Sequence, residues 1–279
     1  VTEEGQQQVA EQLPAWEIEQ HWLNEDAQAE LATLRETLSH QVYNPCRWPL
    51  FAIHVAHYAQ RQRLFVSLDS MMLDGRSIMV LFTEWDRLYR DPRSSLPELA
   101  IRYRDYVVQN RPAAERERQA QAWWQQHLST LPERPALPLA VAPETLQQPR
   151  FRRWSHELSP GRWQQLKEVA KSYGITPSVV LAAAYGEVLA RWSNQTALAI
   201  NLTMFDRQPR HPQINHVIGD FASILLLGYQ SSAGGDFLAA ARRLQQQEGA
   251  ALAQRGVSGI WVLRELARQK GQSMASMPV

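Results

Sequence analysis

The chain has 279 residues, of which 44% are hydrophobic, so it can bury the core of one large domain or of two smaller ones. Its 29 basic and 28 acidic residues leave a formal net charge of +1, and no basic stripe with interleaved aromatic residues occurs, so a nucleic acid is not an expected partner. No apolar run reaches the ~18–20 residues that span a bilayer, so a membrane is not an expected partner either. A single cysteine, Cys46, excludes an internal disulfide framework and favours a reducing, cytoplasmic location.

The first part of the chain predicts a small sheet that leads into a helix. Alternating apolar residues predict a short strand over residues 16–22 and an antiparallel hairpin with strands over residues 50–59 and 63–68. Between the first strand and the hairpin, Asp26 is the expected N-cap of an amphipathic helix. After the hairpin, apolar residues at helical spacing predict a longer helix that begins near Asp74.

Two histidines of the predicted hairpin, His54 and His57, are three positions apart in the sequence. Because successive side chains of a strand point to opposite faces, these two imidazoles are not expected to share a metal ion. His211 and His216, in a later loop, also lack the spacing of metal ligands. The sequence therefore predicts no metal site.

A proline-rich segment divides the chain. Four prolines fall within the thirteen residues Leu131–Pro143, which excludes a helix or a central strand and predicts a stiff, extended connector. We therefore expect three parts: residues 1–130 as part of an N-terminal lobe, residues 131–149 as the connector, and residues 150–279 as part of a C-terminal lobe.

The C-terminal part predicts strands and helices in mixed order. A strand is expected over residues 151–158, and Ser159-Pro160 and Thr176-Pro177 have the residue types of helix starts. A further strand over residues 197–203 places Asn201 near its end. Both halves thus predict α/β structure, as two sandwiches of similar build with a cleft between them.

The link between the hairpin and the next helix carries two carboxylates five residues apart, Asp69 and Asp74. Aspartate often caps a helix, which gives Asp74 a structural interpretation. Asp69 has two interpretations: a catalytic carboxylate that takes up a proton or orients an ammonium group, or an acceptor of backbone N–H groups in the turn. Both remain open from the residues alone.

Several stretches resemble the motifs of heterocyclization domains of nonribosomal peptide synthetases, a branch of the condensation-domain superfamily. In chain order, these stretches are Glu4–Gln7, Asp69–Ser77, Leu131–Pro143, Thr176–Trp192, Gly219–Leu227 and Met277–Val279. One departure is Ala222, which stands where that family usually has Thr. The common order of the motifs makes the resemblance specific. The chain is also similar to the siderophore synthetases that form thiazoline rings, such as those for yersiniabactin and pyochelin.

The resemblance implies an α/β fold of two chloramphenicol-acetyltransferase-like sandwich lobes that form a V with a central cleft. Because the chain starts within one motif and stops within another, we expect a domain that is truncated at both ends. In the family, a Thr and a later Asp carry the cyclodehydration step, and both are expected beyond Val279. The resemblance implies no metal or redox cofactor, because both substrates arrive on the phosphopantetheine arms of carrier protein domains.

The same resemblance suggests roles for six residues. Ordinary condensation domains carry the motif HHxxxDG, and Asp69 and Ser70 stand where its two histidines would be. Since Ser70 cannot act as a base near neutral pH, Asp69 is the candidate catalytic carboxylate. Asn201 resembles a family active-site Asn that can hydrogen-bond a thioester carbonyl, and a turn residue at a strand end is its alternative.

The other four residues are expected to be structural. Asp74 would pair with Arg207 of the other lobe, which would fix the geometry of the two lobes. Ser77 and Asp220 would make hydrogen bonds within their own motifs.

The expected function is the condensation of a carrier-bound acyl thioester with a carrier-bound Cys, Ser or Thr, followed by cyclodehydration to a thiazoline or oxazoline in siderophore synthesis. The expected partners are the upstream and downstream carrier protein domains and the adjacent synthetase modules. Two alternatives remain: an acyltransferase that forms an amide without cyclization, and a non-catalytic module that docks carrier proteins.

Overall fold

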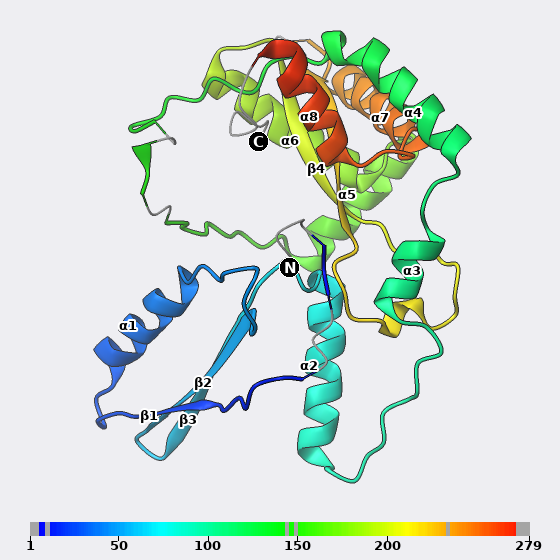
Figure 1. Ribbon diagram of the computed structural model, residues 1–279. Coiled ribbons are helices and arrows are strands. Elements are labelled where there is room, and N and C mark those ends of the chain that lie inside the picture. The colour runs from blue at the N-terminus through cyan, green and yellow to red at the C-terminus, as the bar shows by residue number, and fades with distance from the viewer. Residues whose placement is uncertain (1–5, 9–11, 143–144, 148–149, 233–234, 272–279) are drawn as a thin grey trace. The chain divides into compact units, whose positions relative to one another are not determined.

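The computed structural model describes all residues except 1–5, 9–11, 143–144, 148–149, 233–234 and 272–279 (Figure 1). Contacts within the chain define two compact units. The first unit comprises Val1–Tyr103, Gln148–Phe151 and Pro209–Phe221, and the second comprises Arg104–Gln147, Arg152–Gln208 and Ala222–Val279.

The first unit contains a three-stranded sheet. Its strands are β1 (Glu19–Trp22), β2 (Phe51–Tyr58) and β3 (Arg61–Leu68), in the order β1-β2-β3. The predicted hairpin is confirmed, because β2 and β3 pair antiparallel along their full length. The hairpin turns at Ala59 and Gln60, which both have positive φ, as a two-residue turn between twisted strands requires. The pairing of β1 with β2 is parallel, a direction that the sequence did not indicate.

The described residues of the first unit also form two helices and a short helical turn: α1 (Gln28–Ser39), α2 (Gly75–Arg90) and the 3₁₀ turn η3 (Ile214–His216). Helix α1 lies along one face of the sheet, where Ala27 and Leu31 pack against Ala56 of β2 (Figure 1). The predicted cap of α1 was wrong, because Ala27 rather than Asp26 occupies the N-cap position and makes no side-chain hydrogen bond there. Burial of Ala27 in the small core fixes this helix start instead.

The second unit is built around an antiparallel pair of strands, β4 (Ala197–Phe205) and β5 (Ala222–Gln230). The described helices of the unit are α3 (Tyr103–Gln109, whose first residue belongs to the first unit), α4 (Ala114–His127) with the 3₁₀ turn η1 (Leu128–Thr130), α5 (Pro160–Ser172), α6 (Pro177–Ser193), α7 (Phe237–Ala253) and α8 (Gly259–Lys270). Helices α6, α7 and α8 pack around the strand pair (Figure 1). Leu198, Leu226 and Leu244 are among the fully buried side chains of its core.

Local sequence signals fixed the starts of two helices correctly. Ser159 caps α5 and Thr176 caps α6, and each is followed by a proline at the first helical position. The strand predicted over residues 151–158 was wrong, because these residues form no strand and pair with no described strand. Extended residues become a strand only where a neighbouring strand accepts their hydrogen bonds.

The proline-rich segment forms neither helix nor strand over residues 132–139, as predicted. It is fixed to the second unit, where Ala199 of β4 donates a backbone hydrogen bond to Glu133 O at 2.9 Å, and Gln195 Oε1 accepts from Ala136 N at 2.8 Å. The observed units cut across the predicted parts, because residues 104–130 belong to the second unit and residues 209–221 to the first. The three predicted lobe limits stay a prediction.

None of the described helices is by itself long and apolar enough to cross a bilayer, although α5 and α6 meet that test as a pair that is bent by 98°.

Candidate functional site

Asp74 caps helix α2, as the sequence predicted. Its Oδ1 accepts a hydrogen bond of 2.7 Å from the backbone N–H of Ser77, and its own backbone is extended. Both residues are buried, with 5% of Asp74 and none of Ser77 exposed to solvent. The carboxylate therefore satisfies one of the N–H groups that every helix start leaves without an intrahelical partner.

The start of α2 also makes hydrogen bonds to Gly219, which lies 142 residues after Ser77 in the chain and belongs to another motif. Ser77 Oγ donates to the carbonyl oxygen of Gly219 at 2.8 Å and lies 3.1 Å from the backbone N of Gly219, which donates to it. The backbone N–H of Asp74 also donates to Gly219 O, at 3.1 Å. The Asp69–Ser77 and Gly219–Leu227 stretches, which the sequence shows only as separate motifs, are thus connected by three hydrogen bonds.

Gly219 is a glycine because another side chain lies against its backbone. A Cβ at this position would lie 2.1 Å from the ring of Tyr103. That ring packs edge-on against Phe221, with 5.1 Å between the ring centroids, and its hydroxyl donates to the backbone carbonyl of Asp220. Tyr103 therefore holds the Gly219–Phe221 backbone against the start of α2.

Asp69 lies in a turn that its own side chain stabilises. Its Oδ1 accepts a hydrogen bond of 2.9 Å from the backbone N–H of Met71, and its backbone N–H donates to Leu50 O at 3.0 Å. The hydrogen bond from Met71 N to the Asp69 carboxylate is the turn contact expected under the structural interpretation of Asp69. The carboxylate is partly exposed, as a group that meets a substrate must be, and Ser70 beside it is exposed.

Asn201 lies inside β4 rather than at its end. The strand continues to Phe205, and Asn201 pairs with Leu226 in the middle of β5. Its predicted place at a strand end was therefore wrong. A strand-end turn role for Asn201 is excluded by this register, and its partly buried side chain projects from a regular strand.

Arg207 follows β4 in a loop. Side chains of the second unit contact the residues on either side of it, Asp206 and Gln208. The hydroxyl of Tyr106 donates to Asp206 O at 2.7 Å and accepts from the backbone N–H of Gln208 at 2.9 Å. Arg255 also lies 3.6 Å from Asp206 Oδ1 and donates to Gln208 Oε1 at 3.3 Å. The two residues beside Arg207 are thus fixed, which limits the positions that its guanidinium can reach.

The structure brings together part of the predicted set. Asp74, Ser77 and the Gly219-Asp220 backbone form one cluster in the first unit. Asn201 and Arg207 belong to the second unit. The catalytic roles of Asp69 and Asn201 and the pairing of Asp74 with Arg207 stay predictions.

Sequence reasoning missed a partly buried carboxylate, Glu187, in helix α6. Its Oε1 accepts from the hydroxyl of Tyr229 at 2.6 Å and from the backbone N–H of Ser232 at 2.7 Å, and its Oε2 accepts from Ser231 Oγ at 3.0 Å. Burial by itself raises the pKa of Glu187, but these hydrogen bonds together outweigh it and lower the pKa from 4.5 to about 2. The signal available in the sequence was that Glu187 is the one acidic residue of a mostly apolar helix.

A cavity of about 630 Å³ lies in the second unit, between α4, β5 and α7. Its lining includes Trp123, His127, Tyr229 and Arg243. The rings of Trp123 and His127 stack with 3.9 Å between their centroids. None of the six predicted site residues lines this cavity.

Comparisons with known proteins identify the family. A condensation-domain family model matches residues 3–277. The pyochelin synthetase PchF of Pseudomonas aeruginosa is 37% identical over 257 residues, which cover 90% of this chain and 14% of that protein. The phenyloxazoline synthase MbtB of Mycolicibacterium paratuberculosis is 34% identical over 254 residues, which cover 88% of this chain and 21% of that protein. The chain thus spans a small part of these relatives.

Solved structures agree with this result. The cyclization-docking bidomain of the nonribosomal peptide synthetase EpoB from Sorangium cellulosum is 34% identical, with a TM-score of 0.84 over 94% of this chain and 55% of that one. The nonribosomal peptide synthetase FmoA3 is 30% identical, with a TM-score of 0.83 over 100% of this chain and 30% of that one. The predicted mixed α/β fold is confirmed, and these matches include relatives of the heterocyclization type that the motifs indicated. This chain belongs to the condensation-domain family.

Proposed function

We propose that this chain is part of a heterocyclization domain in a nonribosomal peptide synthetase. Such a domain joins a carrier-bound acyl thioester to a carrier-bound Cys, Ser or Thr, and then closes a thiazoline or oxazoline ring, as in siderophore synthesis. The observation that carries this proposal is the altered signature Asp69–Ser77, in which the histidine pair of ordinary condensation domains is replaced while the capping Asp74 is kept. The similarity to a pyochelin synthetase and to a phenyloxazoline synthase supports it.

The reaction has two parts, which balance separately. In the first, the amine of the acceptor attacks the thioester carbonyl, the carrier thiol leaves, and the amine loses a proton as the amide forms. In the second, the side-chain thiol or hydroxyl attacks the new amide carbonyl, and one water is lost as the C=N bond of the ring forms. The protein needs an acceptor for the proton of the first part and a donor for the carbonyl oxygen in both parts.

Asp69 is proposed as the group that orients the acceptor ammonium and takes up its proton, because its carboxylate is partly exposed at the end of β3. The substitution Asp69→Asn separates this role from the structural one, because an asparagine Oδ1 can still accept from Met71 N and keep the turn. We expect the single-turnover rate of amide formation in the full synthetase to fall by about 10²-fold or more, with the melting temperature unchanged. An unchanged rate would leave Asp69 as a turn residue only.

Asn201 is proposed to donate from its amide to the substrate carbonyl as negative charge develops there. A donor on a regular strand is held more firmly than one in a turn, which favours this role.

Asp74 and Arg207 are proposed to form an ion pair, with Ser77 and Asp220 as the structural residues of their motifs. The Oδ1 of Asp74 accepts the hydrogen bond of the helix cap. The hydrogen bonds of Tyr106 to Asp206 and Gln208 hold the backbone on both sides of Arg207. A double-mutant cycle with Asp74→Asn and Arg207→Gln should give a coupling free energy of about 0.5–3 kcal/mol in urea denaturation. Additive effects of the two substitutions would contradict the pair.

One experiment separates the proposed function from its two alternatives. The full synthetase is supplied with both loaded carrier domains, and the product on the carrier is analysed by mass spectrometry after a single turnover. A product lighter than the linear amide by one water supports heterocyclization. The linear amide alone would identify an amide-forming condensation domain, and no product would identify a carrier-docking module.

The proposed partners follow from this reaction. They are the upstream and downstream carrier protein domains, whose phosphopantetheine arms bring both substrates, and the adjacent synthetase modules. The ring-forming steps as written need no redox cofactor, because no oxidation occurs. The exposed, unpaired thiol of Cys46 fits a proposed cytoplasmic location.

A further inference from the structure

Three metal-ligating side chains converge on one face of the sheet in the first unit. Glu19 and His21 are two residues apart on β1, so their side chains point to the same face. His54 lies on β2, directly opposite Glu19 in the parallel pairing. Strand pairing therefore assembles a histidine–histidine–carboxylate set that no sequence spacing reveals.

The separations of the donor atoms fit one small cation. His21 Nε2 lies 2.9 Å from His54 Nδ1, and the Glu19 carboxylate oxygens lie 3.6 Å from His21 Nε2 and 3.4 Å from His54 Nδ1. Around a tetrahedral Zn²⁺ with bonds of about 2.0–2.1 Å, neighbouring donor atoms are separated by roughly 3.3–3.4 Å. The two carboxylate distances are to different oxygens, Oε1 for His21 and Oε2 for His54. The three distances lie on both sides of the tetrahedral value, so small side-chain rotations would place both ring nitrogens and one carboxylate oxygen around one ion.

A hydrogen bond alone explains the arrangement less well. Two neutral imidazoles can share one N–H···N contact, as the 2.9 Å distance between His21 and His54 allows. The carboxylate of Glu19, however, lies at or beyond the usual limit of a direct hydrogen bond to either ring. A cation between the three groups would satisfy both ring lone pairs and the carboxylate charge at once.

The site is open to solvent. The side chain of Glu19 is 63% exposed, so an ion and a bound water can reach the site from solvent.

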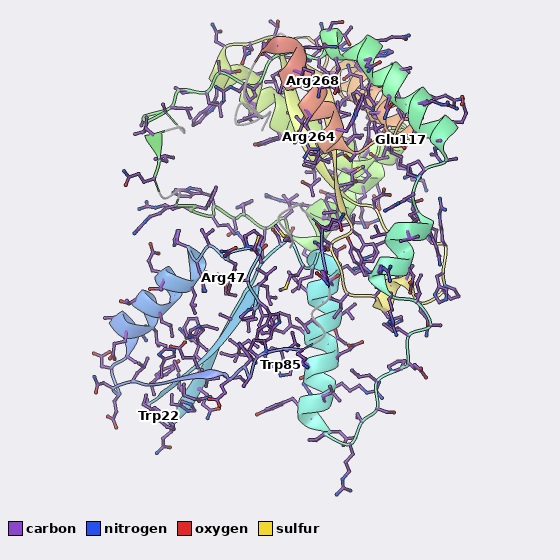
Figure 2. The ribbon with its side chains drawn as sticks, in the orientation of Figure 1. Trp22, Arg47, Trp85, Glu117, Arg264 and Arg268 are labelled. Carbon is purple, nitrogen blue, oxygen red and sulfur yellow. The ribbon has the colours of Figure 1, made fainter. Side chains whose placement is uncertain are left out.

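We propose that Glu19, His21 and His54 bind a divalent cation of the zinc class, with a water molecule as the fourth ligand. The ion would fasten β1, an edge strand of only four residues, to the central strand β2. His57 is not part of this site, because it lies on the opposite face and stacks against Trp22 at 4.1 Å between ring centroids. Figure 2 shows Trp22, the last residue of β1. The proposal is independent of the ring-forming function, because none of its residues belongs to the signature motifs.

Isothermal titration calorimetry with ZnCl₂ tests the site directly on this chain. We expect one Zn²⁺ per chain, and loss of affinity by more than about 10-fold in His54→Ala, since even the removal of an outer-shell partner costs about 10–100-fold. His57→Ala is the matched control from the same strand, and its affinity should equal that of the wild type. With CoCl₂, the wild type should show the intense visible bands of four-coordinate Co²⁺, and His54→Ala should not.

Glu19→Gln keeps the test decisive if His54→Ala fails to fold, because Glu19 is exposed and its replacement removes no buried contact. This variant should keep the circular dichroism spectrum of the wild type and bind Zn²⁺ more weakly. The proposal is wrong if the wild type shows no saturable binding of Zn²⁺. It is also wrong if Glu19→Gln binds as tightly as the wild type, or if His57→Ala loses affinity as strongly as His54→Ala.

Discussion

The substitution Gly219→Ala is expected to destabilise the protein by about 3 kcal/mol, because overpacking typically costs about 1–3 kcal/mol and occasionally more. The new Cβ would lie 2.1 Å from the ring of Tyr103. That ring cannot move easily, since it packs on Phe221 and its hydroxyl is bonded to the Asp220 carbonyl. If the Gly219 backbone moves instead, its hydrogen bonds to Asp74 and Ser77 are lost. Urea denaturation measures the loss.

Two further variants show whether the contact with Tyr103 is the cause. Gly249→Ala, inside α7, is the matched control, because a Cβ there meets nothing within 4 Å. It should stabilise the protein by roughly 0.5–1 kcal/mol, the usual difference between alanine and glycine in a helix. In a Tyr103→Ala background, Gly219→Ala should cost much less than in the wild type. Equal costs in the two backgrounds would show that the ring is not responsible.

The substitution Glu187→Gln is expected to lower the free energy of unfolding by about 3 kcal/mol at neutral pH, since hydrogen bonds to charged groups contribute about 1.5–3 kcal/mol each. The carboxylate accepts bonds from Tyr229, Ser231 and Ser232, whereas the glutamine amide offers one oxygen and places an NH₂ group where Glu187 Oε2 accepts. Tyr229 is 1% exposed, so its hydroxyl cannot turn to water as compensation.

The pH dependence of this effect has a definite sign. The pKa of Glu187 is lowered from 4.5 to about 2 in the folded protein, so in this range the unfolded chain binds more protons than the folded one. The stabilisation by the carboxylate is therefore complete above the unfolded value of 4.5 and is lost as the pH falls toward 2. In urea denaturation across this range, the difference between wild type and Glu187→Gln should shrink toward zero. A difference that does not change with pH would contradict the assignment.

Glu248 provides a control of opposite sign. Burial raises the pKa of this carboxyl group, so its ionised form destabilises the folded protein. Protonation of Glu248 favours folding, and this contribution is lost as the pH rises through its folded pKa. Glu248→Gln should therefore leave stability unchanged or increase it at neutral pH, whereas Glu187→Gln decreases it.

Local sequence signals predicted what depends on neighbours along the chain. Asp74, Ser159 and Thr176 cap their helices as expected, because a cap needs only the residue and the N–H groups that directly follow it. The hairpin of β2 and β3 was also predictable, since two alternating segments joined by a short turn pair with each other.

Signals of the same kind failed where a distant segment decides the outcome. Residues 151–158 were predicted as a strand but pair with no described strand. Ala27 replaces Asp26 at the start of α1 because it is buried in the small core. Asn201 lies inside β4, since β5 pairs with that strand as far as Phe205.

By itself, the sequence determined the mixed α/β class, the capped start of α2 and, through the order of its motifs, the condensation-domain family. The tertiary structure decided how those motifs meet: Ser77 binds both backbone groups of Gly219, which lies 142 residues further along the chain. It also decided that Glu187 accepts hydrogen bonds from Tyr229, Ser231 and Ser232 and that His21 lies beside His54. The physical reason is that caps and turns are satisfied within a few residues, whereas close contacts and strand pairing depend on segments that only folding brings together.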